Sequence, residues 1–234
     1  FYGSAMPFPH IQGAFASQLV VTESQCEQVG EDVSIHHAAL AVPLSVALHG
    51  VSRAGSLAGK HVLITGCGPI GALCVVAARY LGALSVTVTD LVDEALNVAT
   101  ALGADQVINV HDSDALETFK EDKGWFDVVI EASGTPAALA SALEVARPRG
   151  IIVQLGLGGD IALPMNVVVA KELNLRGSFR FHEEFAWAAK LIAEKKLNLD
   201  PIVSDVFPSD DAIAAFEHAN DRTKSMKVQI AFSA

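Results

Sequence analysis

The feature that most constrains the fold is a regular alternation between short apolar runs, rich in β-branched residues, and stretches with a helical pattern. It extends from Lys60 to Phe181. Uninterrupted runs such as His61–Thr65 are typical of strands that are covered on both faces. Strands that alternate with helices of about ten residues predict a doubly wound parallel sheet, so the expected fold class is α/β. The expected strands are His61–Thr65, Ser85–Thr89, Gln106–Asn109, Phe126–Ile130, Ile151–Leu155 and Leu173–Phe179, and the expected intervening helices are Ile70–Leu81, Asp93–Leu102, Asp114–Glu121 and Pro136–Ala146.

The segments that flank this alternation have a different pattern. Residues 1–50 are rich in loop-forming residues, with one expected strand at Ala14–Val21 and one expected helix at Ala41–Val51. Beyond Phe181 we expect two helices separated by a proline-containing loop, and then a final strand. These elements are Glu184–Ala193, Asp210–Ala219 and Lys227–Phe232.

Composition excludes several classes of protein. Lys and Arg total 16 against 27 Asp and Glu, and the net charge of −11 argues against nucleic-acid and anionic-membrane partners. No apolar run reaches the roughly 20 residues that span a bilayer. The sequence begins at Phe1 without a signal-peptide pattern, which suggests that a segment precedes it. The cysteines Cys26, Cys67 and Cys74 lack C-x-x-C spacing, which is typical of free thiols in a reducing, cytoplasmic compartment.

A glycine-rich turn follows the first strand of the alternation. Residues 65–71 read Thr-Gly-Cys-Gly-Pro-Ile-Gly, a G-x-G-x-x-G pattern between a strand and a helix. Gly66 permits a tight turn, Gly68 lets a pyrophosphate approach the backbone, and Gly71 lets the helix pack closely on the strand. Pro69 suits the first turn of a helix, whose free N–H groups favour a phosphate. A turn that only connects strand and helix is the alternative.

An acidic residue completes the pattern of a dinucleotide site. Asp90 ends the second strand, about 20 residues beyond the turn, where a carboxylate accepts both ribose hydroxyls of an adenosine and repels a 2′-phosphate. The residues that follow, Leu91 to Glu94, include no basic residue. The sequence therefore predicts NAD rather than NADP as the cofactor.

Three further strand ends carry glycine or polar residues. These segments are Glu131–Gly134, Leu155–Gly159 and Gly177–Phe181. Ligands of open parallel sheets bind beyond the carboxyl ends of the strands, so we expect these segments near the nicotinamide. Arg180 could hold a substrate carboxylate through two parallel hydrogen bonds, or it could form an ion pair with Glu183, Glu184 or an acid elsewhere.

These motifs together resemble a known family. The glycine turn, Asp90, the phrase Phe126–Gly134 and the phrase Arg176–Phe181 are similar to those of the zinc-dependent medium-chain alcohol dehydrogenases. The match is to the sorbitol and polyol branch. Three segments, Phe1–Met6, Phe8–His10 and Glu144–Gly159, resemble the L-idonate 5-dehydrogenases within it most.

The resemblance implies a role for each of these residues. Gly66, Gly68, Pro69, Ile70 and Gly71 would contact the dinucleotide, and Asp90 would hold the adenine ribose. The residues expected to border the nicotinamide are Leu155, Gly156, Leu157, Phe179, Arg180 and Phe181. Arg180 would also reach the substrate, a small polyol or sugar acid. Relatives are homodimers or homotetramers, and an oligomer is expected here as well.

The resemblance also implies a division into domains. Residues 46–182 would form the NAD-binding Rossmann domain, and residues 1–45 and 183–234 the remnant of a GroES-like catalytic domain. The zinc ligands of relatives would lie upstream of Phe1, so no metal ligand is expected in this chain, and zinc only in the full-length protein. Val42 stands where relatives carry a glutamate close to the zinc, which weakens the expectation of zinc.

The function that we expect is hydride transfer between NAD and a secondary alcohol of a polyol or sugar acid, with this chain inactive by itself. Two alternatives are a zinc-free reductase of the quinone type and a dinucleotide-binding protein without catalysis.

Overall fold

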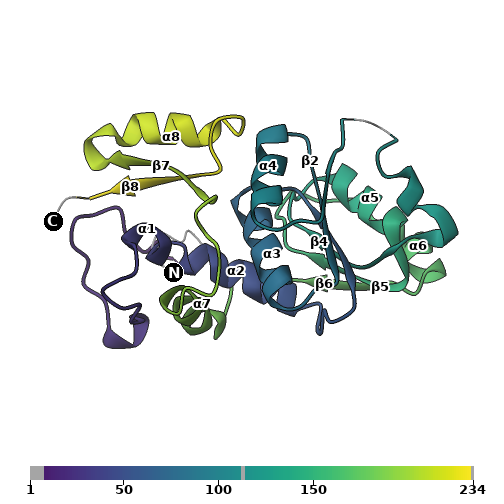
Figure 1. Ribbon diagram of the computed structural model, residues 1–234, viewed down its shortest axis with the longest axis horizontal. Helices are drawn as coiled ribbons and strands as arrows, with labels where there is room; N and C mark the ends of the chain where they lie inside the picture. Colours follow the sequence, from purple (N-terminus) through teal and green to yellow (C-terminus); the bar gives the residue numbers. More distant parts are fainter. Residues whose placement is uncertain (1–7, 112–113, 233–234) are drawn as a thin grey trace.

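The computed structural model describes residues 8–111 and 114–232, and its centre is a six-stranded parallel sheet (Figure 1). The sheet is made of β1 (His61–Thr65), β2 (Ser85–Asp90), β3 (Gln106–Asn109), β4 (Phe126–Glu131), β5 (Ala146–Gln154) and β6 (Asn174–Gly177). The strand order is β3-β2-β1-β4-β5-β6, which is the order of a doubly wound dinucleotide-binding sheet. The predicted α/β fold class is confirmed. The motif Phe1–Met6 lies outside the described residues.

Helices cover both faces of this sheet. Successive residues of a strand point to opposite faces, and in β1 Val62 and Ile64 belong to one apolar core while Leu63 belongs to the other. The first core is closed by helices α2, α3, α4 and α7, and the second by α5 and α6. The bounds of these helices are α2 (Ala41–Ser52), α3 (Pro69–Tyr80), α4 (Asp93–Ala101), α5 (Pro136–Val145), α6 (Met165–Ala170) and α7 (Glu184–Ala193). Two dry cores explain the uninterrupted apolar runs in the sequence.

A smaller group of elements lies beside the sheet (Figure 1). Strand β7 (Val203–Pro208) pairs with β8 (Lys227–Ala231) in parallel, and α8 (Ala212–Asn220) packs against both. The short helix α1 (Ile35–Ala38) precedes α2, which packs against α3 and α7. The division into two domains stays a prediction. In the part of the chain that the structure describes, no helix is both long enough and apolar enough to cross a membrane.

The expected strand at Ala14–Val21 is wrong. These residues have irregular backbone and are exposed throughout, and the 3₁₀ turn η1 (Glu23–Gln25) follows them. A strand is stabilised by a neighbour that pairs with its backbone, and among the described residues this segment pairs with none.

Two further expectations also need correction. Residues 114–121 do not form an α-helix. They lead into the 3₁₀ turns η2 (Glu117–Phe119) and η3 (Glu121–Lys123), where Asp122 has a φ of 51° that interrupts any helix. The proline-containing segment before α8 is not a loop, because it contains β7. Pro208 ends that strand, where its lack of an N–H group costs least.

Candidate functional site

The glycine-rich turn connects β1 to α3 and has the conformation that its sequence predicts. Gly66 has a φ of +85°, which favours glycine, and its N–H donates to the carbonyl of Thr89 at 2.8 Å. A Cβ on Gly71 would lie 1.9 Å from the carbonyl oxygen of Gly66, so only glycine fits there. A Cβ on Gly68 would meet nothing within 4 Å. The turn is therefore closely packed on one side and open on the other.

The open side leads to the start of α3. Gly68 is the N-cap residue and Pro69 is the first helical residue, and no side chain caps this end of α3. The N–H groups of Ile70 and Gly71 belong to the first turn, where an α-helix has no backbone acceptor for them. Together with the helix dipole, such groups favour an anion such as a pyrophosphate.

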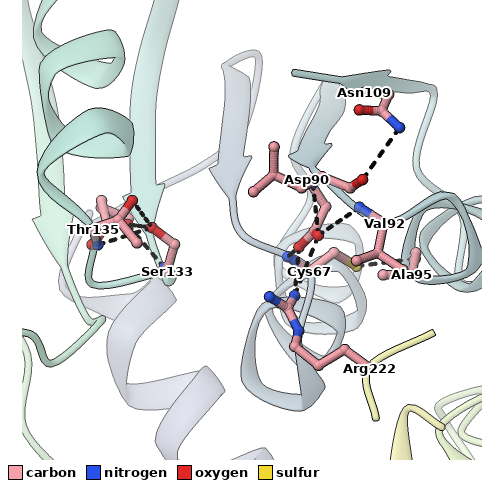
Figure 2. Close-up of polar contacts among 10 residues, drawn as sticks. Cys67, Asp90, Val92, Ala95, Asn109, Ser133, Thr135 and Arg222 are labelled. Carbon is pink, nitrogen blue, oxygen red and sulfur yellow. Dashed lines mark hydrogen bonds and ion pairs between the residues drawn. The ribbon is translucent and has the colours of Figure 1, made fainter. Parts of the chain in front are cut away.

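Asp90 lies at the end of β2 and is held by backbone donors (Figure 2). The N–H of Cys67 donates to its Oδ2 at 2.6 Å, and the N–H groups of Leu91 and Val92 donate to its Oδ1 at 2.7 and 3.0 Å. Only 3% of the side chain is exposed. These bonds fix the carboxyl group beside the glycine turn. The turn and Asp90, which the sequence predicts to belong to one dinucleotide site, are therefore close together in space.

A cation that the sequence did not predict accompanies Asp90. Nη2 of Arg222 lies 3.0 Å from Oδ2 and 3.2 Å from Oδ1 of Asp90, and Figure 2 shows the arginine reaching it from the C-terminal segment. The expectation of a carboxylate without a basic neighbour is therefore wrong. It rested on the residues next to Asp90 in sequence, whereas Arg222 is 132 residues away. An Asp-Arg dipeptide in a surface loop carries no signal of such a contact.

A cavity of about 370 Å³ opens between these groups. Its polar rim includes Gly68, Asp90 and Arg222. Its apolar wall is formed by Leu91, Val110, Leu116, Ala132, Ala137 and Ala138. An apolar slot with a carboxyl group at its rim can hold a flat heterocycle together with the hydroxyl groups of an attached sugar. The described residues therefore fit the adenosine half of a dinucleotide.

The ends of β4, β5 and β6 lie side by side, as predicted. Glu131 pairs with Gln154, and Gln154 pairs with Gly177. The Glu131 side chain is fully buried, and it accepts hydrogen bonds from the N–H groups of Ser133 and Gly134 at 2.8 and 3.0 Å. Its second oxygen accepts a hydrogen bond from Nε2 of Gln154. This role of Glu131 was not predicted, although a carboxyl group directly after an apolar strand is a usable signal.

The residues expected near the nicotinamide follow β5 and β6. Leu155 is buried against Gly50 of α2, whereas Leu157 is 79% exposed. The N–H of Gly156 donates to the carbonyl of Glu131 at 2.7 Å. The role of these three residues stays a prediction.

The segment after β6 is held partly by ring contacts. Arg180 has a left-handed backbone, with a φ of 58°, and its guanidinium carbon lies 5.1 Å from the ring centre of Phe179. Phe181 stacks on Phe185 of α7. Glu184, one of the partners considered for Arg180, hydrogen-bonds to Nδ1 of His49 at 2.9 Å. The contact of Arg180 with a substrate stays a prediction.

The cysteines do not form a metal site. Burial raises the pKa of the Cys67 thiol to about 12 and also raises the pKa of Cys74, so both remain protonated, whereas Cys26 is exposed. Within residues 8–111 and 114–232 no group of three or more His, Cys, Asp or Glu side chains is placed to hold a metal ion. Val42 lies near the start of α2 and is 45% exposed.

Comparisons with known proteins agree with this geometry. Residues 69–194 match the profile of a family described as zinc-binding dehydrogenase. The chain is 41% identical over 233 residues to L-idonate 5-dehydrogenase (NAD(P)(+)) of Escherichia coli K12, covering 99% of this chain and 68% of that protein. The crystal structure of L-idonate 5-dehydrogenase from the same bacterium superposes with a TM-score of 0.96 over 99% of this chain and 67% of that one.

A second relative is more distant. The sorbitol dehydrogenase of Gallus gallus is 32% identical over 212 residues, which are 88% of this chain and 59% of that protein. The chain therefore spans only part of the length of the relatives that it matches.

Proposed function

Because the chain belongs to the zinc-binding dehydrogenase family, we propose that it carries the cofactor-binding half of an enzyme that transfers a hydride between a nicotinamide dinucleotide and a secondary alcohol of a polyol or sugar acid. The family resemblance that the motifs predicted is thereby confirmed. The activity, the choice of NAD and the substrate class are our proposals.

One observation carries the proposal of a dinucleotide site. The open glycine turn and the Asp90 carboxyl group, which come from the ends of adjacent strands, line the same cavity. The N–H groups of Ile70 and Gly71 would bind the pyrophosphate, and Asp90 would accept the hydroxyl groups of the adenosine ribose. The apolar wall beside Leu116 and Ala137 would exclude water from the adenine. NAD supplies a hydride acceptor when it is bound.

The nicotinamide end would lie at the ends of β5 and β6. The turn at Gly156 is held against Glu131 by a backbone hydrogen bond. That bond would orient the segment from Leu155 to Leu157 as a wall for the nicotinamide. Phe179 and Phe181 would limit the access of water from the other side. The Arg180 guanidinium would then hold the substrate, with a carboxylate as its best ligand because the planar fork of N–H groups matches two carboxylate oxygens.

The substrate class is supported by the relatives. One is named for L-idonate, a sugar acid, and another for sorbitol, a polyol. Both substrate types offer a secondary alcohol, and only the acid offers a carboxylate for Arg180. We therefore propose a sugar acid of the idonate type as the preferred substrate.

Zinc, the metal in the name of the family, does not fit the residues that the structure describes. They form no cluster of donors, and Val42 lacks a ligating atom. Zinc in the complete gene product would need ligands from outside the described residues. A cytoplasmic location and a homo-oligomeric state also remain proposals.

Steady-state kinetics of the complete gene product test the proposed function. We expect oxidation of L-idonate and, more slowly, of sorbitol, with NAD as the better acceptor. NADH binding without turnover of any polyol or sugar acid would favour the non-catalytic alternative, and reduction of quinones with NADPH would favour the quinone-type reductase. Failure to bind either dinucleotide would refute the site itself.

A further inference from the structure

The ion pair between Asp90 and Arg222 has no explanation in the proposed function, although it lies on the rim of the cofactor cavity. Among the described residues that line this cavity, Asp90 is the only acidic one and Arg222 the only basic one. The two charges cancel at the point where the adenosine ribose would bind. A 2′-phosphate brought there would therefore meet a neutral pair instead of a bare carboxylate.

The two partners differ in exposure and in how they are held. Asp90 is fixed by backbone N–H groups and 3% exposed, whereas the Arg222 side chain is 55% exposed. Oδ1 of Asp90 accepts two backbone hydrogen bonds and Oδ2 accepts one, so Arg222 occupies the acceptor position that remains for a ribose hydroxyl group. A ribose hydroxyl group that binds Asp90 must therefore displace the Arg222 guanidinium or share the carboxylate with it. Because more than half of the Arg222 side chain faces solvent, packing does not hold its guanidinium against the carboxylate.

The backbone of Arg222 is well anchored. Asp221 accepts hydrogen bonds from the N–H and Oγ1 of Thr223 at 3.1 and 2.7 Å, and the N–H of Met226 donates to Oγ of Ser204 in β7 at 2.6 Å. The turn after α8 is thus tied to β7. It holds the base of the Arg222 side chain beside the cavity while the guanidinium group stays accessible.

The chemistry of the guanidinium suits a phosphate. Only Nη2 contacts Asp90, which leaves Nη1 and Nε on the same planar group as donors for a second anion. A phosphate monoester carries a charge of about −1.5 to −2 and three acceptor oxygens. Arginine binds such groups through two parallel hydrogen bonds, and it stays charged at all working pH values.

We propose that Arg222 is the residue that sets cofactor specificity in this site: with NAD it shares the Asp90 carboxylate with the ribose hydroxyl groups or moves aside from it, and with NADP it swings onto the 2′-phosphate. The inference rests on the proposed dinucleotide site and deepens it. It predicts a modest preference for NAD, because Asp90 still favours a hydroxyl group, and a strict preference once Arg222 is lost. The name of the E. coli relative, which includes NAD(P)(+), is compatible with this reading.

The test compares two ligand pairs that differ by a 2′-phosphate. NADPH and NADH are titrated by fluorescence, and adenosine 2′,5′-bisphosphate and adenosine 5′-monophosphate by calorimetry, against the complete gene product and its variants. Arg222→Gln should raise the Kd of both 2′-phosphorylated ligands by about 10- to 100-fold, the range of a charge-assisted hydrogen bond, and change the other two by less than about threefold. Arg222→Lys, which keeps the charge, should fall between.

Lys224→Gln is the matched control, because it removes a cation from the same turn and Lys224 pairs with Asp221 instead of Asp90. It should leave all four Kd values unchanged. The Kd of NADPH for the unmutated protein should also rise more steeply with salt than that of NADH, a readout that needs no variant.

Three results would overturn the inference: equal effects of Arg222→Gln on the ligands with and without a 2′-phosphate, equal salt dependence of the NADPH and NADH Kd values, or an effect of Lys224→Gln equal to that of Arg222→Gln. So would an unmutated protein that binds NADH and not NADPH. An unmutated protein that binds neither dinucleotide would instead refute the proposed function, on which the inference depends.

Discussion

Glu131→Gln should destabilise the protein strongly, although it changes only one atom of a side chain. Glu131 is fully buried, and its two oxygens accept hydrogen bonds from Ser133, Gly134 and Gln154. Glutamine replaces one of these acceptors with an NH₂ donor, which would face the NH₂ group of Gln154. Rotating the Gln154 amide would relieve this conflict, because Oε1 of Gln154 is buried without a partner among the described residues. That rotation would break the 2.9 Å bond from Nε2 of Gln154 to the carbonyl of Gly156.

The cost follows from these two losses. A hydrogen bond to a charged group contributes about 1.5–3 kcal/mol and a neutral one about 0.5–1.5 kcal/mol. After partial relaxation, the loss of both hydrogen bonds should lower the free energy of unfolding by about 2–4 kcal/mol. For a chain of this length, 1 kcal/mol corresponds to about 2–4 °C in Tm. The variant should therefore melt roughly 4–16 °C lower than the unmutated protein.

Urea unfolding followed by circular dichroism, together with thermal melts, would measure this effect. Glu172→Gln is the control, because its side chain is 70% exposed and pairs only with Arg149 on the surface. It should change the free energy of unfolding by less than about 0.5 kcal/mol. A Glu131→Gln variant that loses less than about 1 kcal/mol would show that Glu131 does not hold the strand ends together.

Three further changes test other parts of the account. Asp90→Ala should weaken NADH binding by about 1–3 kcal/mol, because the ribose hydroxyl groups lose their acceptor, and unchanged binding in a fluorescence titration would contradict this role. Arg180→Ala should lower kcat/KM for L-idonate by an amount that corresponds to a loss of about 1.5–3 kcal/mol in transition-state stabilisation, and it should lower kcat/KM for sorbitol by clearly less. Equal losses on both substrates would exclude a contact between Arg180 and the carboxylate. Burial raises the pKa of Glu184, but hydrogen bonds from His49 and from the His182 N–H outweigh burial and leave that pKa below its ordinary value. The ionised Glu184 side chain therefore stabilises the fold fully above its unfolded-state pKa, and this stabilisation is lost as the pH falls through the lowered folded-state pKa. Glu184→Gln should remove this pH-dependent loss of stability from acid unfolding and leave stability at low pH unchanged.

Local sequence was sufficient to predict the sheet and to identify the glycine turn and Asp90 as candidate site residues. The strands β1, β2 and β4 are buried on both faces, so their composition alone distinguishes them from loops. Gly66 and Gly71 are fixed by local sterics, which a G-x-G-x-x-G pattern encodes directly. Asp90 was found for the same reason, because its position depends only on where β2 ends.

Features that depend on distant contacts could not be predicted in this way. Arg222 meets Asp90 only because the turn after α8 is tied to β7. Strand β7 itself was missed because two polar residues, Ser204 and Asp205, are adjacent in it and interrupt the alternation of apolar and polar residues. The segment Ala14–Val21 has the composition of a strand but lacks a partner among the described residues, which its own sequence cannot reveal. The buried bond between Glu131 and Gln154 depends on the register of β4 against β5.

A crystal structure of the complete gene product with bound NADH would test directly whether the cavity beside Asp90 holds the adenosine half of a dinucleotide. We predict the pyrophosphate at the N–H groups of Ile70 and Gly71, the adenine in the apolar slot, and the ribose hydroxyl groups within hydrogen-bond distance of Asp90. A dinucleotide that lies elsewhere, or that leaves the Asp90–Arg222 pair and the glycine turn without a ligand contact, would contradict the account.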